Sequence, residues 1–190
     1  MAIIYKQCPK CRSKNTVKIV FGEPTFAALQ KAEKGEIRLG GCCILEDGPE
    51  YYCKDCENEW NKEQAVDAAY TRIEGIKATI GGFFDGHYIV EINLISRQVV
   101  WSFYGRGEDE TIQKSIGPDT AKKLIEDLKM INLLNWKAKY IEPGILDGTN
   151  WSVEISRDGR KISKHGNIKF PDEWDAFCKI IRGITGKKFS

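Results

Sequence analysis

Apolar and polar residues alternate along the chain from Ile76 to about residue 116, and this period of two is typical of half-buried β-strands. Short turn sequences at residues 85–86 and 96–97 interrupt the alternation. The pattern predicts an antiparallel meander with strands over residues 76–84, 87–95 and 98–104, and a candidate fourth strand over 111–116.

The apolar period becomes helical after Gly117-Pro118-Asp119, where a proline and an acid favour a helix start. One apolar stripe follows, formed by Ala121, Leu124, Ile125, Leu128 and Ile131. A second helix is predicted over about residues 172–184, with an apolar face formed by Trp174, Phe177, Cys178 and Ile181. We expect both helices to pack on the sheet.

A second hairpin is predicted from residues 151–156 to 160–163, joined by the strong turn sequence Asp158-Gly159. Helices segregated from an antiparallel sheet are typical of the α+β class. We therefore assign residues 76–190 to an α+β domain, in which the meander packs with two helices. Residues 63–75 are expected to form a helical linker that precedes it.

Residues 1–62 are expected to form a separate N-terminal domain. Residues 16–21 alternate as a strand does, and residues 26–34 are helix formers that end at Gly35. Residues 36–39 and 51–52 then favour two further short strands.

Two CxxC motifs flank this segment, Cys8-Pro9-Lys10-Cys11 and Cys53-Lys54-Asp55-Cys56. Two residues between the cysteines let a tight turn aim both sulfurs at one ion, and two such turns present four thiolates tetrahedrally. The sequence therefore predicts a zinc ribbon with a helical insert and a structural Zn²⁺. Its predicted ligands are Cys8, Cys11, Cys53 and Cys56.

Two residues after the second motif are expected to complete this site. Asn58 stands where a turn residue with a positive φ is expected, because asparagine tolerates the left-handed conformation. Trp60 is expected to cover the ion.

The region around these motifs resembles a group of uncharacterised bacterial proteins with an N-terminal zinc ribbon. The resemblance is carried by Gly22-Glu23-Pro24, a short helix, Leu39-Gly40-Gly41-Cys42, and then Pro49, Cys53, Cys56 and Trp60. It implies zinc and a ribbon fold, and it implies no activity.

The second domain is similar, more loosely, to a domain of unknown function in uncharacterised bacterial proteins. Leu146-Asp147-Gly148-Thr149-Asn150-Trp151, and Phe170-Pro171 before a helix, carry this resemblance. It implies a fold and no role. Asp147 and Asn150 are candidate polar groups of a site, although Asp-Gly-Thr-Asn is a turn sequence first.

Composition and length set the remaining limits. The chain has 190 residues, which is long enough for one ribbon and one larger domain. Its formal net charge is +2. We expect a cytoplasmic protein, because no apolar run is long enough to span a membrane and the N-terminus does not have the pattern of a signal peptide. Seven cysteines, four of them expected ligands, argue against a disulfide framework.

Cys42-Cys43 and Cys178 are the three cysteines outside the predicted site. We expect Cys42 and Cys43 to lie on a strand, one facing the zinc site and the other packed elsewhere. The alternative is an oxidisable thiol or one that exchanges with a ligand. Cys178 is expected in the core.

The sequence offers little for catalysis. His87 and His165 each stand next to a glycine, without a second ligand nearby in sequence, and a surface position is favoured over a catalytic one. A zinc ion held by four cysteines has no open position at which to activate water. No small-molecule substrate is indicated, and the sequence favours a protein without catalytic activity.

Three hypotheses follow from these observations. The first is a non-enzymatic recognition protein that binds another protein. The second is nucleic-acid binding through the basic C-terminal region, where residues 157–188 contain an excess of Lys and Arg. The third is an enzyme built on the second domain, using His87, His165 or Asp147.

A protein-binding surface on the second domain is expected near the aromatic end of the meander. Trp101, Phe103 and Tyr104 are the residue types that interfaces favour. Trp101 and Phe103 share one side of their strand and can equally form the buried face, so that Tyr104 and Arg106 are the better surface candidates.

Overall fold

The computed structural model describes residues 3–43, 47–82, 86–105, 107, 109–141 and 148–189. The chain divides into two compact units, an N-terminal unit (Met1–Ala69) and a C-terminal unit (Tyr70–Ser190). The class is α+β, with four α-helices and two mixed sheets in the described ranges. No helix in these ranges is long and apolar enough to cross a membrane.

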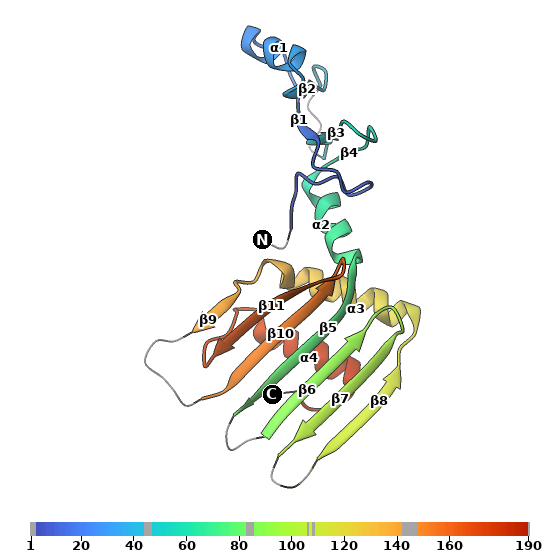
Figure 1. Ribbon diagram of the computed structural model, residues 1–190, viewed down its shortest axis with the longest axis vertical. Coiled ribbons are helices and arrows are strands. Elements are labelled where there is room, and N and C mark those ends of the chain that lie inside the picture. The colour runs from blue at the N-terminus through green and yellow to red at the C-terminus, as the bar shows by residue number, and fades with distance from the viewer. Residues whose placement is uncertain are drawn as a thin grey trace. The chain divides into compact units, whose positions relative to one another are not determined.

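The N-terminal unit contains a sheet with the order β2-β1-β3-β4 (Figure 1). Its strands are β1 (Thr16–Val20), β2 (Ile37–Leu39), β3 (Tyr51–Cys53) and β4 (Glu59–Trp60). Helix α1 (Phe26–Glu33) connects β1 to β2, which pair in parallel, whereas β3 is antiparallel to β1 and to β4. The predicted strands and helix of this region are confirmed, and β4 is an addition.

Helix α1 begins and ends where its sequence dictates. The Thr25 hydroxyl accepts a hydrogen bond from the Ala28 amide at the N-terminus. Gly35, with φ of 68°, takes the left-handed conformation just beyond the C-terminus. Within α1, none of the residues is buried. The helix therefore contributes little to a core.

The core of the N-terminal unit is small and lies at the cysteines. Its buried members are Cys8, Tyr51, Cys53, Trp60 and Ala65. The Trp60 ring stacks on Tyr51 with centroids 5.7 Å apart, and its indole nitrogen donates to the Tyr5 carbonyl oxygen at 2.9 Å. A unit of this size with so few large buried side chains is in the range where metals or disulfides supply stability.

The C-terminal unit is built on a sheet with the order β8-β7-β6-β5-β10-β11-β9 (Figure 1). The strands are β5 (Ile73–Gly82), β6 (Gly86–Asn93), β7 (Gln98–Tyr104), β8 (Glu110–Ser115), β9 (Lys139–Ile141), β10 (Asn150–Arg157) and β11 (Arg160–Asn167). The predicted meander is confirmed as β5 to β8, and the predicted hairpin as β10 and β11. The expectation of an antiparallel sheet was wrong at its edge, because β9 pairs with β11 in parallel.

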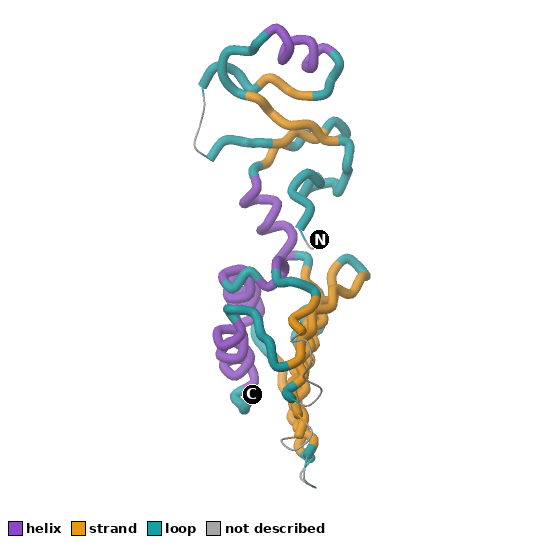
Figure 2. Tube along the Cα trace, turned by 90° about the vertical axis from the view of Figure 1, so that its left-hand side faces the viewer, coloured by secondary structure: helices purple, strands orange, loops and turns teal. Residues whose placement is uncertain are grey.

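Two helices, α3 (Pro118–Met130) and α4 (Trp174–Thr185), lie on one side of this sheet, as Figure 2 shows. The predicted apolar faces are confirmed, since Leu124, Leu128 and Ile131 of the first stripe are buried. All four predicted face residues of α4 are buried as well, namely Trp174, Phe177, Cys178 and Ile181. The opposite sheet face is polar, with the ion pairs Lys77–Glu91 and Lys161–Glu154 at 2.7 Å each.

Helix α2 (Lys62–Thr71) occupies most of the predicted helical linker, residues 63–75, but the prediction was wrong for its last three residues, because β5 already begins at Ile73. The two compact units meet inside this helix, between Ala69 and Tyr70. The side chain of Gln64 accepts a hydrogen bond from the Asn61 amide, and the Asn61 side chain accepts one from the Gln64 amide. This reciprocal pair is a capping box, which explains why the helix begins here.

One lysine of β11 points into the interior of the C-terminal unit. Lys164 is 3% exposed, and its ammonium donates hydrogen bonds to the carbonyl oxygens of Leu134 and Trp136, in and just after the 3-10 helix η1 (Leu133–Asn135). Burial lowers the pKa of Lys164 to about 8, while the two carbonyl acceptors favour its charged form.

Candidate metal centre

Each CxxC motif folds into a tight turn because of a backbone hydrogen bond across it. The Arg12 amide donates to the Cys8 carbonyl oxygen, and the Glu57 amide donates to the Cys53 carbonyl oxygen, both at 2.9 Å. Arg12 and Glu57 then adopt positive φ angles of 67° and 59°. The expectation that Asn58 takes this conformation was wrong by one residue, because the chain reverses directly after the second cysteine.

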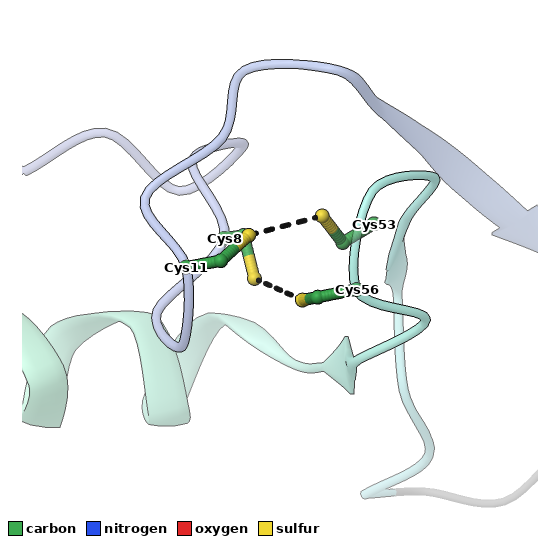
Figure 3. Close-up of side chains that lie close together, drawn as sticks. All are labelled: Cys8, Cys11, Cys53 and Cys56. Atoms are coloured by element: carbon green, nitrogen blue, oxygen red, sulfur yellow. Dashed lines mark hydrogen bonds between the residues drawn. The ribbon is translucent and has the colours of Figure 1, made fainter.

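The four cysteine sulfurs come together between these two turns. They all lie within 4.8 Å of one another, with Cys8 Sγ 3.6 Å from Cys56 Sγ and Cys11 Sγ 3.5 Å from Cys53 Sγ. Figure 3 shows the side chains projecting from the two turns toward a common centre. The strand β3 and the turn before β1 thus bring together residues more than forty positions apart in sequence.

The geometry fits a tetrahedral four-sulfur metal site. Four sulfurs about 2.3 Å from a central ion are separated from one another by about 3.8 Å, close to the distances observed here. Cys8 and Cys53 are buried, Cys56 is half-buried and Cys11 is exposed, so that the centre lies at the edge of the small core. Trp60 belongs to that core, as expected for a residue that covers the site.

Backbone amides point at the sulfurs and favour their thiolate forms. The amides of Cys11 and Lys10 donate to Cys8, that of Ser13 to Cys11 and that of Asn58 to Cys56. The Asn58 amide, with the neighbouring thiols, lowers the pKa of Cys56 to about 7.

The thiols of Cys8 and Cys11 resist ionisation for different reasons. Burial raises the pKa of Cys8. The Ser13 amide favours the Cys11 thiolate, but the sulfurs of Cys56, Cys53 and Cys8 together with burial outweigh it and raise the pKa of Cys11 to about 12. Four thiolates at these separations repel one another, and a divalent cation at their centre removes that repulsion.

Asp55 joins the two turns and was not singled out from the sequence. Its carboxylate accepts hydrogen bonds from the Ser13 hydroxyl at 2.5 Å and the Asn15 amide group at 2.6 Å, and these bonds lower the pKa of Asp55. The Lys54 amide also donates to the Asn15 carbonyl oxygen at 3.0 Å. The only sequence signal for this contact was an acidic residue between the two cysteines of the second CxxC motif.

Cys42 and Cys43 lie apart from this centre. Both side chains are exposed, and neither residue belongs to a strand. Their sulfurs are 3.9 Å from each other. The expectation that they pack in the interior was therefore wrong, because Gly40 and Gly41 end β2 before the cysteines and leave them on a surface turn.

The predicted catalytic candidates do not come together. His87 and His165 are exposed on the open face of the large sheet, but they belong to β6 and β11, which β5 and β10 separate. Three strand spacings amount to about 14 Å. Asp147 lies outside the described residues. Asn150 makes the contacts expected of a turn residue, since its side chain donates to the Gly148 carbonyl oxygen and accepts from Asn167.

The aromatic residues of β7 divide between the two faces of the sheet. Trp101 is buried and Phe103 is half-buried on the face that the helices cover, whereas Tyr104 is 44% exposed on the open face. The structure thus supports Tyr104 alone as a surface residue. Arg106 lies outside the described residues.

The basic residues of the C-terminal region lie on different surfaces. Lys161 is on the open sheet face, while Lys179 and Arg182 are on the exposed side of α4. Lys164 is buried, and the Arg157 side chain lies 3.9 Å from the Asp158 carboxylate. These five residues therefore do not lie on one face of the unit.

No protein-family model matches the chain, and a search of curated proteins finds no match.

Proposed function

We propose that this chain is a zinc-binding, non-enzymatic recognition protein in which a structural Zn²⁺ holds the N-terminal unit together. The four converging sulfurs are the observation that carries the proposal. Zinc is the metal most often held by four cysteines in structural sites, and the residues that would hold it are Cys8, Cys11, Cys53 and Cys56. Once bound, the ion would supply a cross-link between the two turns.

The absence of an open coordination position argues against catalysis at this centre. Four protein sulfurs complete a tetrahedral zinc site, which leaves no position for water or substrate. His87 and His165 support no alternative active site, because two strands separate them. The role of the centre that the geometry supports is therefore to fix the fold of the segment between the two motifs.

That segment presents apolar side chains to solvent. Phe26 and Leu29, three residues apart on α1, are 76% and 42% exposed. Val20 and Leu39, which are directly opposite each other on β1 and β2, are 38% and 37% exposed. Apolar side chains concentrated on a small exposed segment are typical of protein-binding surfaces. We infer that the recognised partner is a protein that contacts α1.

Affinity capture with matched variants tests this role. The double variant Phe26→Asp with Leu29→Asp removes the apolar pair on α1, whereas Ile95→Asp with Met130→Asp changes two apolar residues of the C-terminal unit that are at least as exposed. A partner protein recovered by the wild type should be titrated against both variants. We expect the α1 variant to bind the partner at least tenfold more weakly, which corresponds to a loss of about 1.4 kcal/mol or more of binding free energy. The control should bind as the wild type does.

Equal loss of binding in both variants would refute a surface centred on α1. Zinc content of all three proteins should be the same, which separates loss of the surface from loss of the fold. A nucleic acid recovered in place of a protein would overturn the proposed class of partner.

A further inference from the structure

One row of paired residues crosses the helix-covered face of the large sheet. In this row a single aliphatic residue stands between aromatic residues. Phe103 pairs with Tyr88, Tyr88 with Ile80 and Ile80 with Trp151 across four neighbouring strands. Directly paired residues point to the same side of a sheet. Ile80 is therefore flanked by an aromatic pair on one side and by Trp151 on the other.

Aromatic rings form a wall on each side of Ile80. The Tyr88 and Phe103 centroids lie 4.8 Å apart and form one wall. On the other side, the Phe170 ring stacks on Trp151 with centroids 6.2 Å apart, and the Trp174 centroid lies 5.2 Å from that of Phe170. Phe170 and Trp174 form the second wall. The Trp151 indole is fixed by a hydrogen bond to the Lys169 carbonyl oxygen at 2.8 Å. Strands β6, β7 and β10 and the start of α4 therefore position every ring of the two walls except Phe170.

A cavity of about 650 Å³ lies between these walls, which is the size of a small-molecule site. Its lining includes Gly81, Gly82 and Gly86, of which Gly82 and Gly86 share the face of Ile80 and Tyr88 and have no side chain to fill the space. Gly86 is required there, because a Cβ at this position would lie 2.7 Å from the Tyr104 carbonyl oxygen and 2.8 Å from the Phe103 ring. Tyr88, Phe103 and Phe170 are only half-buried, so that their rings are available to a ligand.

Lys188 places a positive charge at this cavity, held there by the C-terminal segment. Trp101 donates a hydrogen bond from its indole nitrogen to the Lys188 carbonyl oxygen at 2.7 Å, and Phe189 is fully buried beside Phe177. The Lys188 ammonium lies 5.8 Å from the centre of the Tyr88 ring. Its neighbour Lys187 instead pairs with Glu110 at 2.5 Å.

We propose that this cavity binds a small flat aromatic compound with a single negative charge, such as an aromatic carboxylate. The ring would lie between the Tyr88–Phe103 wall and the Phe170–Trp174 wall, where offset stacking is favourable. The anionic group would reach the Lys188 ammonium in a charge-assisted hydrogen bond. Asp175 also lines the cavity, and its negative charge disfavours ligands with several phosphates.

Amide NMR spectra of the full-length protein test this site with naphthalene carboxylate as the probe. We expect the amide signals of the three lining glycines to shift on titration. Lys188→Met should weaken binding about tenfold, the usual effect of losing a hydrogen bond to a charged group. Lys187→Met, the matched control, should bind within twofold of the wild type, because Lys187 is directed to Glu110.

A second comparison needs no variant. Naphthylmethylammonium has the same ring with a positive charge, and cyclohexane carboxylate has the same charge without the flat ring. Both should bind more weakly than naphthalene carboxylate by at least fivefold. Absence of glycine shifts at millimolar probe, equal loss in both lysine variants, or tighter binding of the cation would overturn the assignment.

Discussion

The residues that follow each CxxC motif adopt a conformation that favours glycine, although neither is glycine. Arg12 and Glu57 have φ angles of 67° and 59°. For side chains of this kind the left-handed region costs about 1 kcal/mol each. The turns that aim the sulfurs are therefore mildly strained, and contacts between the two turns must offset that strain.

Asp55 provides such contacts, which leads to a prediction for zinc affinity. Asp55→Asn should weaken zinc binding, because hydrogen bonds from Ser13 and Asn15 to a carboxylate are stronger than those to an amide. We expect an effect of about tenfold, the lower end of the effects found for groups that orient metal ligands. Competition with a chromophoric chelator measures this change.

Glu33→Gln is the matched control for Asp55, because it removes a negative charge from exposed α1. It should leave zinc affinity unchanged. A normal affinity in Asp55→Asn would show that the two turns are held together without this carboxylate.

Cys42 and Cys43 allow a second prediction at this scale. Because both side chains are exposed, replacing either by alanine should change the free energy of unfolding by less than about 0.5 kcal/mol. Zinc content should stay the same. Denaturant unfolding and elemental analysis measure the two quantities, and loss of zinc from Cys42→Ala would reveal an unexpected ligand.

At the scale of elements, β11 combines a regular alternation with one buried charge. Ile162, Lys164 and Gly166 share the face toward the helices, and Lys164 hydrogen-bonds to the carbonyl oxygens of the segment around η1. The lysine thus satisfies backbone acceptors that the 3-10 helix leaves open. It connects the edge of the sheet to the chain between α3 and β9.

The lowered pKa of Lys164 predicts a pH dependence of stability. Between pH 8 and 10.5 the unfolded chain binds the proton while the folded chain has released it, so that the free energy of unfolding rises with pH. We expect the wild type to gain about 1–3 kcal/mol relative to Lys164→Met across this window, and no relative gain below pH 8.

Tryptophan fluorescence during denaturant unfolding measures this difference, since Trp101, Trp136, Trp151 and Trp174 belong to the C-terminal unit. Comparison with Lys164→Met cancels the titration of other lysines and tyrosines. A wild type that loses stability relative to the variant as pH rises would contradict the account.

Local patterns predicted most elements and the pairing of strands that follow each other in the meander and the hairpin, but not the pairing of strands far apart in sequence. The alternation in β5 to β7 and the stripes of α3 and α4 identified these elements, because each has one buried face. The parallel edge strand β9 is only three residues long, too short for a period to be recognised. The pairing of β5 with β10, which joins the meander to the hairpin, involves residues far apart in sequence and has no local signal.

The metal centre and the aromatic cavity also differ in how far the sequence reveals them. The four cysteines were predictable because ligand type and spacing are visible in the sequence itself. Asp55 acts through hydrogen bonds to the other turn, and the aromatic cavity depends on the register of four strands. Such arrangements become visible only with the tertiary structure.

The whole molecule contains two units that differ in the source of their stability. The C-terminal unit has a continuous core between one sheet face and two helices, with Leu128, Phe177 and Ile181 fully buried. The N-terminal unit has a handful of buried residues gathered at the cysteines. We therefore expect metal to be essential for one unit and unimportant for the other.

Cys11→Ser tests this difference. The variant should lose the dispersed amide NMR signals of the described residues before Tyr70 and keep those of the C-terminal unit. Cys43→Ser, which changes an exposed cysteine outside the cluster, should keep both sets. A fully folded N-terminal unit in Cys11→Ser would show that its fold does not depend on the metal.

X-ray absorption at the zinc edge of the purified protein tests the central claim most directly. The account predicts one zinc ion per chain with four sulfur neighbours at about 2.3 Å and no nitrogen or oxygen neighbours. Iron in place of zinc, a mixed set of sulfur and lighter neighbours, or a protein without metal would contradict it.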